Sequence, residues 1–463
     1  MATTDNLITE AADNVLVGLF SDPAVRADPY PAYRQLRETA PVHHSAVLPL
    51  WVATRYDDCG TVLRDPRFGK SDEVQRIFGS SAQSADREVP IISRYSMLRM
   101  NPPDHTRMRS LVAREFTPRR VDELRPAVEA MVDEVLDQLA DAGGGDVMDV
   151  LAFPLPVRVI GELLGVPIED REQFRWIVRD AAGALEPMAS AETIAAAETA
   201  SNTMNDYFRS LIAERRNRHS DDLIGGLIGV SDGGDRLSEN ELVATIVLLF
   251  AAGFETTTNL IGNGLISLLR NRDQMQMLRS DPTLGHRAVE EMLRYESSVQ
   301  LDARTALEET DIAGHHIDAG QVVLTLLGAA NRDPDRYQDP DRFDITRTGT
   351  QHLSFAAGIH YCLGAPLARL EGEVVFERLL ARFPTIDGDT GGDEALVAPA
   401  SSPPAPCWPS ASAGAATTAR PPRDRRGSRG PSTARSRSAP PPRSPSRSPR
   451  SARPSATPTP RPR

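Results

Sequence analysis

The sequence predicts a mainly α protein with a small β subdomain, and two observations lead to this fold class. Apolar residues recur at helical spacing over long stretches, most clearly in residues 121–139 and 242–269. Short runs around residues 51–56 and 312–326 instead have the alternation and turn residues of strands. We therefore expect helices to build most of the core and a few short strands to form a small sheet.

The elements of the first half are taken in chain order. Residues 51–56 predict a short strand, and residues 121–139, 174–177 and 207–216 predict helices. Residues 242–269 give the longest helical pattern, and over its first half this pattern is apolar on nearly all sides. A helix without a polar face is expected to be central and buried.

The second half supplies the remaining strands and a last helix. Residues 312–321 predict a hairpin that leads into a strand at 322–326. Residues 363–383 predict a helix that ends before Pro384, because proline cannot continue the backbone hydrogen bonding.

Composition places the chain among ordinary globular proteins. It has 463 residues, of which 40% are hydrophobic and 25% charged. Its three cysteines, Cys59, Cys362 and Cys407, have neither C-x-x-C nor zinc-ligand spacing, which fits a reducing cytoplasm. The N-terminus lacks the basic start and apolar core of a signal peptide. The longest apolar run, 242–253, is too short to span a bilayer, so we expect no membrane association.

Charge is divided unevenly along the chain. Residues 401–463 contain thirteen arginines and one aspartate, whereas the chain as a whole has a net charge of −12. The first 400 residues are therefore strongly acidic, which argues against nucleic-acid binding by the body of the protein. The sequence divides into an extension at 1–27, one continuous body at 28–388, and a Pro/Ser/Arg-rich segment at 389–463. That last segment is expected to be disordered. It is either a basic binding arm or, as we prefer, the product of coding DNA read in a shifted frame.

The most informative stretch is the decapeptide from Phe355 to Gly364, which places Cys362 just before a helical segment. Free amides at a helix N-terminus are expected to lower the cysteine pKa and so to favour a thiolate. Gly358 and Gly364 allow positive φ angles and close approach of the backbone to a flat macrocycle. Phe355 can shield an iron–sulfur bond from water. The alternative is a structural cysteine, the usual role of an unpaired one.

This decapeptide resembles the F-x-x-G-x-H-x-C-x-G signature of the cytochrome P450 haem-thiolate monooxygenases. It departs from the commonest form at Ala356, where glycine is usual, and alanine fits if the local backbone is in the β or αR region. The resemblance covers residues 28–388. It implies the family's triangular-prism fold, with haem b between the long central helix and the helix after the cysteine loop, and with Cys362 as the axial ligand to iron.

Within the long central helix, residues 252–257 read Ala-Gly-Phe-Glu-Thr-Thr. The small side chains of Ala252 and Gly253 would let a flat cofactor lie against the helix. The Thr256 hydroxyl can bond to the Ala252 carbonyl and open the helix locally. By resemblance, Glu255 and Thr256 are the acid–alcohol pair that delivers protons during dioxygen activation. On the pair alone, a core helix with an incidental threonine is the more frequent explanation.

Charged residues around the motif also match family positions. Glu291 and Arg294 form an E-x-x-R pair, and Arg342 supplies the distant arginine of a buried structural brace. The resemblance assigns four residues to the haem propionates: Arg109, Arg304, His105 and His360. An isolated pair or a lone histidine would be a solvated surface feature more often than part of a site.

The remaining expectations concern partners and substrate. The sequence contains no flavin or dinucleotide motif, so electrons from NAD(P)H are expected to arrive through a separate ferredoxin reductase and ferredoxin. Arg107, Arg114 and Arg369 are candidates for a basic docking patch, or are ordinary solvated charges. The resemblance favours a cytoplasmic, monomeric enzyme.

The substrate is expected to be a large, mostly apolar small molecule such as a macrolide or another polyketide, hydroxylated or epoxidised with dioxygen. The segments expected to line its pocket are 71–98, 181–203 and 299–303. A fatty acid, a terpene or a tethered peptide remains an alternative. Two other classes are a non-catalytic helper protein, against which Cys362 argues, and a peroxygenase, against which Glu255 and Thr256 argue.

Overall fold

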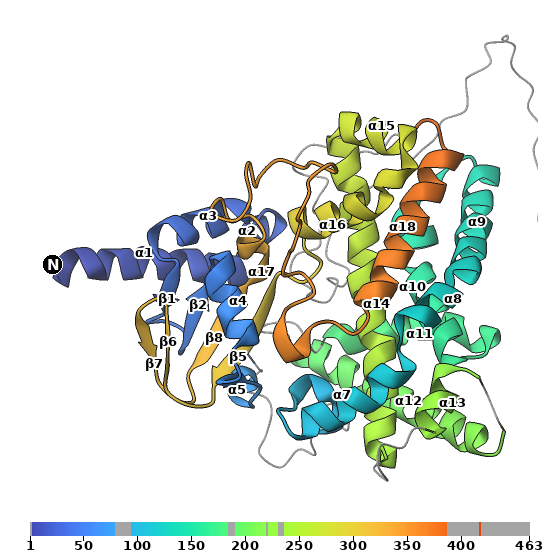
Figure 1. Cartoon of the computed structure of the whole chain (residues 1–463), viewed down its shortest axis with the longest axis horizontal. Helices are drawn as coiled ribbons and strands as arrows, with labels where there is room; N and C mark the ends of the chain where they lie inside the picture. Colours follow the sequence, from blue (N-terminus) through green and yellow to red (C-terminus); the bar gives the residue numbers. More distant parts are fainter. Residues whose placement is uncertain are drawn as a thin grey trace, which may run out of the picture. The chain divides into compact units, whose positions relative to one another are not determined.

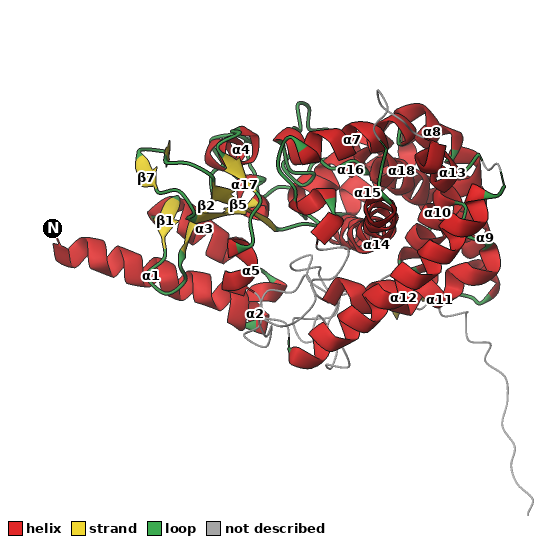
Figure 2. Ribbon diagram, turned by 90° about the horizontal axis from the view of Figure 1, so that it is seen from below, coloured by secondary structure: helices red, strands yellow, loops and turns green. Residues whose placement is uncertain are grey.

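The computed structural model describes residues 2–78, 94–183, 190–218, 221–229 and 236–386, together with the pair 416–417. Within these residues helices dominate and the strands gather into a small sheet region (Figure 1). The predicted fold class is therefore confirmed. Figure 2 shows the same division, with the strands gathered near α1 and α4 and most of the later helices away from them.

The main sheet has five strands in the order β1-β2-β8-β5-β3. The β2 and β8 strands pair in parallel, and the other neighbours are antiparallel. Every residue of β8 is buried, as expected for a central strand. The strands are β1 (Val42–His44), β2 (Leu50–Ala53), β3 (Phe68–Gly69), β5 (Leu301–Ala306) and β8 (Val322–Leu326).

The predicted hairpin is also confirmed. Strands β6 (Thr310–Ile312) and β7 (His315–Ile317) pair antiparallel through a two-residue turn. Both turn residues, Ala313 and Gly314, have positive φ angles of 48° and 84°, which match the twist of a tight hairpin.

Helix α1 (Ala2–Ser21) joins residues 1–27 to the body of the protein. Its Ala12, Leu16 and Leu19 are buried in a cluster with Tyr33 and Leu36 of α3 (Tyr30–Thr39). The segment set apart from the sequence as an extension thus packs within the same compact unit, Met1–Arg420. The other helices of this region are α2 (Pro23–Ala27), α4 (Tyr56–Arg64) and α5 (Glu73–Phe78).

The helical part is organised around α14 (Glu239–Arg270), which begins with a capping box between Ser238 and Glu241. Most of its residues are buried, as its all-round apolar pattern predicted. Within the described residues it is the one helix long and apolar enough to cross a membrane, a property that buried core helices share. It packs against α10, α12, α16 and α18.

Shorter helices precede and follow α14 along the chain. The predicted helix at 121–139 is interrupted at Leu124, after which a new helix begins at Arg125 with Pro126 in its first turn. The helices before α14 are α7 (Asp104–Glu115), α8 (Pro118–Glu123), α9 (Arg125–Asp141), α10 (Pro154–Leu164), α11 (Ile168–Ala182), α12 (Ala191–Arg216) and α13 (Leu223–Gly229). Those after it are α15 (Arg272–Ser280), α16 (Gly285–Tyr295), α17 (Leu327–Ala330) and α18 (Ala365–Arg382).

One short strand lies far along the chain. Strand β9 (Ala416–Thr417) pairs antiparallel with β4 (Gly145–Asp146), two residues from each. Apart from this pair, residues 389–463 lie outside the described residues, as do parts of the expected pocket segments 71–98 and 181–203.

Candidate functional site

The cysteine loop is held as a compact turn at the start of α18. The Cys362 N–H donates to the Phe355 carbonyl at 2.9 Å, and the Tyr361 N–H donates to the Gly358 carbonyl at 3.1 Å. The backbone N–H groups of Gly364 and Ala365 both favour the Cys362 thiolate, as expected at the first turn of a helix. The Cys362 side chain is itself exposed, so it is accessible to a ligand.

The net pKa of Cys362 differs from the expectation. Although Cys362 is open to solvent, desolvation by the protein atoms around its thiol raises the thiol pKa, and the Gly364 and Ala365 amides with Arg109 and Arg369 offset that increase incompletely. The helix N-terminus alone therefore does not make this cysteine a thiolate, which corrects the predicted lowering. A metal ion bound to this sulfur would supply the missing stabilisation, because coordination deprotonates a thiol outright.

Two residues of the loop have left-handed backbone. Gly358 has φ +70°, and a Cβ there would lie 2.3 Å from the Leu63 carbonyl oxygen, so only glycine fits. Ala356 has φ 55°, which corrects the expectation of a β or αR backbone and explains why glycine is usual there. Gly364 has φ −78°, so the positive φ expected of it is wrong too.

The predicted acid–alcohol pair lies on helix α14. The Thr256 hydroxyl donates to the Ala252 carbonyl at 3.0 Å, as predicted, but α14 continues without a break, so the expected local opening is absent. Ala252 is exposed, whereas a Cβ added at Gly253 would meet Ile160 of α10. Of the two small residues, Ala252 is thus the one on the exposed side of the helix, and Gly253 faces its neighbour α10.

Four groups expected to bind carboxylates come together between α7, β5 and the loop. The rings of His105 and His360 lie 4.3 Å apart, and Arg109 donates to the Tyr361 carbonyl at 2.5 Å. Within the described residues, both ring nitrogens of His105, Nε2 of His360 and Nη2 of Arg304 are buried without a hydrogen-bond partner. Buried donors without partners are rare in native proteins, so this cluster is built to receive acceptors.

Electrostatics support the same conclusion. Burial and then the Arg304 and Lys70 charges lower the pKa of His360 to about 3, and burial with Arg109 and Arg304 lowers the pKa of His105. An anion placed here would relieve the repulsion among these groups.

Two residues of this cluster have no counterpart in the sequence predictions. The Lys70 Nζ donates to Asp302 Oδ1 at 2.9 Å, and Arg304 Nη1 donates to Asp302 Oδ2 at 2.6 Å. Asp302 therefore orients both cations, and those cations hold its pKa well below the ordinary value although burial opposes them. Lys70 is the single lysine of the chain, and Asp302 is two residues before Arg304 on the same face of a strand; these were the available signals.

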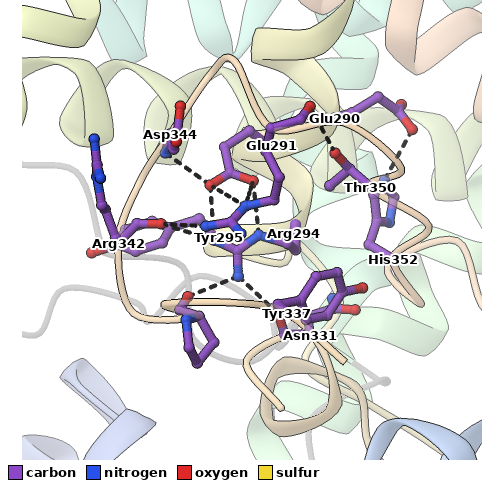
Figure 3. Close-up of polar contacts among 12 residues, drawn as sticks. Glu290, Glu291, Arg294, Tyr295, Asn331, Tyr337, Arg342, Asp344, Thr350 and His352 are labelled. Carbon is purple, nitrogen blue, oxygen red and sulfur yellow. Dashed lines mark hydrogen bonds and ion pairs between the residues drawn. The ribbon is translucent and has the colours of Figure 1, made fainter. Parts of the chain in front are cut away.

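The predicted brace is present, but its third arginine is different. Glu291 and Arg294 are fully buried and share two hydrogen bonds of 2.8 Å. The side chain that completes the network is that of Arg347, with Nε 3.2 Å from Glu291 Oε2. Arg342 contributes its backbone carbonyl to Arg294, while its side chain is exposed and directed away from Glu291 (Figure 3). This corrects the assignment of Arg342 as the side-chain partner.

The brace reaches the cysteine loop through Asn331. Arg294 donates to the Asn331 carbonyl at 2.9 Å (Figure 3). The Asn331 side chain accepts a hydrogen bond from the Leu353 N–H and donates one to the Ser354 hydroxyl. Ser354 immediately precedes Phe355, so a continuous buried network connects Glu291 to the first residue of the loop. Nothing in the spacing of Asn331 pointed to this role.

A mainly helical body, a buried central helix and one accessible cysteine beside a cationic cluster are the features of a haem-thiolate site. The Cytochrome P450 family model matches residues 185–387. Cytochrome P450 107B1 of Saccharopolyspora erythraea is 44% identical over 372 residues, which cover 79% of this chain and 90% of that protein. Cytochrome P450 monooxygenase PikC of Streptomyces venezuelae is 43% identical over 376 residues, covering 80% and 87%.

Solved structures agree with these relatives. The bacillaene polyketide synthase cytochrome P450 PksS of Bacillus subtilis 168 superposes with a TM-score of 0.72 at 37% identity, covering 80% of this chain and 92% of that one. CalO2 gives a TM-score of 0.74 at 36% identity, covering 81% and 92%. The chain therefore belongs to the cytochrome P450 family, and it is a cytochrome P450 monooxygenase with a haem-thiolate iron cofactor.

The residues present fit that cofactor. Haem carries two carboxylates, and the unpartnered ring nitrogens of His105 and His360 with the Arg304 guanidinium can donate hydrogen bonds to them. The Cys362 side chain is exposed and follows His360 by two residues. The backbone amides of Gly364 and Ala365 favour its thiolate form. The donor set thus suits an anionic macrocycle with one thiolate ligand.

Proposed function

We propose that this enzyme hydroxylates or epoxidises a large, mostly apolar secondary metabolite, with a macrolide or related polyketide as the preferred class. The observation that carries the proposal is the set of similar proteins: PikC, PksS and the 6-deoxyerythronolide B hydroxylase of S. erythraea, the last 40% identical over 378 residues. The expected pocket segment 299–303 supports an apolar ligand, because its one charge, Asp302, is already paired with Lys70 and Arg304.

The proposed roles divide among the site residues. The haem, when bound, supplies the chemistry that inserts one atom of dioxygen into a C–H or C=C bond. Cys362 would hold the iron, and Arg109, Arg304, His105 and His360 would hold the propionates.

Thr256 would hold and pass a proton at Oγ1. A hydroxyl that donates to the Ala252 carbonyl still has lone pairs to accept a hydrogen bond from water, so it can orient that water. Glu255, the preceding residue on α14, would resupply the proton from the solvent side.

Electrons would come from NAD(P)H through a ferredoxin reductase and a ferredoxin in the cytoplasm. A basic docking patch would include Arg107, Arg114 and Arg369. Of these, Arg107 pairs with Glu241 and Arg369 pairs with Glu290, so their charges are partly neutralised within the chain. The test is reconstitution: product should form with NADPH, reductase and ferredoxin, and omission of ferredoxin should abolish it.

The haem-thiolate assignment is tested by the absorption spectrum of the reduced protein under carbon monoxide. We expect the strongly red-shifted Soret band of this family, and we expect Cys362→Ala to lose it. Cys59→Ala is the matched control, since Cys59 is fully buried and bonded to the Ala53 carbonyl. A wild-type protein that binds haem without the shifted band would contradict the assignment.

The substrate class is tested by binding spectra and by mass spectrometry of products. Macrolactones, free fatty acids, terpenes and a fatty acyl chain on an acyl carrier protein would be compared as ligands. The carrier-bound chain is included because P450BioI, crystallised with hexadec-9Z-enoic acid ligated acyl carrier protein, has a TM-score of 0.73 at 37% identity. Tight binding and oxygenation of a macrolactone supports the proposal, whereas turnover confined to fatty acyl ligands favours the alternative.

We also propose that residues 389–463 are dispensable for haem binding, as a disordered or frame-shifted segment. Two truncations separate the possibilities, one ending at residue 388 and one at residue 420, because only the second retains β9 and its pairing with β4. Equal haem content in both supports the proposal. Loss of haem in the shorter chain alone would show that the β4–β9 pairing is required.

A further inference from the structure

Behind the cysteine loop, Arg369 of α18 is held in a defined position by three neighbours. Its Nε and Nη2 bind the two carboxylate oxygens of Glu290 on α16 at 2.6 and 3.3 Å. Its Nη1 donates to the Tyr361 hydroxyl at 3.3 Å, and its guanidinium carbon lies 4.7 Å from the centre of the Phe355 ring. A planar guanidinium bound at both oxygens and stacked on a ring has little freedom to move.

The two loop residues that Arg369 contacts flank the cysteine. The Phe355 carbonyl accepts a hydrogen bond from the Cys362 N–H, and Tyr361 directly precedes Cys362. The Arg369 charge is among the groups that favour the ionised form of Cys362. The guanidinium is thus a fixed positive charge on the side of the loop that faces α16.

Glu290 is a fixed negative charge in the same network. Burial raises the pKa of its carboxyl, but His352 and Arg369 outweigh burial and lower the pKa to about 2, so it is ionised at neutral pH. His352 Nε2 lies 3.6 Å from Glu290 (Figure 3), and the His352 ring lies 5.5 Å from that of Phe355. Glu290 therefore offsets part of the field that Arg369 exerts on the loop.

We propose that the Arg369–Glu290 pair sets the reduction potential of the haem iron through its charge. Reduction adds one electron to the iron–thiolate unit, so a nearby cation favours the reduced state and a nearby anion disfavours it. Arg369 and Glu290 therefore shift the reduction potential in opposite directions. The inference rests on Cys362 as the axial ligand.

The experiment is a potentiometric titration of the full-length, haem-loaded protein without substrate, at one pH and ionic strength. Arg369→Gln removes the cation and should lower the equilibrium constant for reduction by about threefold to about tenfold. Glu290→Gln unmasks the cation and should raise it by a similar factor. A tenfold change corresponds to about 59 mV for a one-electron couple.

Matched variants separate charge from structural damage. Arg378→Gln removes the same charge from the same helix, nine residues or roughly 13 Å farther along, and should leave the potential unchanged. Arg369→Lys retains the charge and should stay near wild type. The double variant Glu290→Gln with Arg369→Gln restores the net charge and should return toward wild type even if each single variant is less stable.

Opposite shifts in the two single variants support the proposal. Shifts of the same sign, which loosened packing around Phe355 would cause, overturn it, and so does the absence of any shift. The carbon monoxide spectrum of each variant keeps this outcome apart from the haem-thiolate assignment. If the shifted Soret band is present and the potentials do not move, only the charge-pair inference fails.

Discussion

Glu371 in α18 is predicted to destabilise the folded protein at neutral pH, so that Glu371→Gln should stabilise it. Glu371 is 2% exposed, and its Oε2 has no hydrogen-bond partner among the described residues. It shares a helix face with Leu367, Val374 and Val375, which are buried as well. Burial raises the pKa of its carboxyl well above the ordinary value of 4.5, so the folded protein retains the proton there.

The magnitude follows from linkage between protonation and folding. Because the pKa is raised in the folded state, the stabilising contribution is fully present below the ordinary pKa of 4.5 and is lost as the pH rises toward the folded-state pKa. Each pH unit in that interval costs the wild type about 1.4 kcal/mol. Between pH 5 and pH 7, the advantage of Glu371→Gln should therefore grow as the pH rises, because glutamine does not ionise.

The assay is urea unfolding of the haem-loaded protein at several pH values between about 5 and about 7.5. Glu290→Gln is the matched control, a second glutamate on the neighbouring helix α16. Its pKa is lowered to about 2, so its stabilisation is fully present above pH 4.5 and is lost as the pH falls toward 2. The control should therefore be destabilised by a nearly constant amount across the range. Stability curves for Glu371→Gln and wild type that run parallel would refute the reasoning.

Three further predictions test the network, the loop and the proton path. Arg347→Ala should lower the free energy of unfolding by about 2–4 kcal/mol, whereas Arg342→Ala, at an exposed side chain, should change it by less than about 0.5 kcal/mol. Equal effects would support Arg342 as the side-chain partner of Glu291. Gly358→Ala should cost more than about 3 kcal/mol because its Cβ meets a carbonyl oxygen, and Gly364→Ala about 1 kcal/mol or less, both measured by urea unfolding. Thr256→Ala should keep the carbon monoxide band but divert reducing equivalents from product to hydrogen peroxide; unchanged coupling between NADPH consumed and product formed would count against its role.

The sequence was sufficient for features that depend on neighbours along the chain. Helical periodicity located α14 and α18, alternation located β2 and β8, and turn residues located the β6–β7 hairpin. The hydrogen bond from Thr256 to Ala252 was predictable as well, because four residues of helix fix that geometry. Such features need no knowledge of where the rest of the chain lies.

Features that depend on the path of a loop were not predictable in this way. Arg342 and Arg347 lie five residues apart in irregular chain, and only the fold shows which side chain turns toward Glu291. The left-handed backbone of Ala356 goes against the usual preference of alanine, so the residue type did not predict it; the one indication was the glycine that is usual at this position of the signature.

Electrostatic balances needed the tertiary structure most. The sequence placed Cys362 at a helix N-terminus, but the burial that raises its pKa depends on how the fold packs protein atoms around the thiol. Lys70, Asp302 and Arg304 meet because strands β3 and β5 are neighbours in the sheet. The sequence by itself determined the class of enzyme and the candidate cysteine ligand, since both depend on contiguous motifs. The charges that surround the ligand were decided by the fold, because desolvation and Coulomb interactions depend on distance in space.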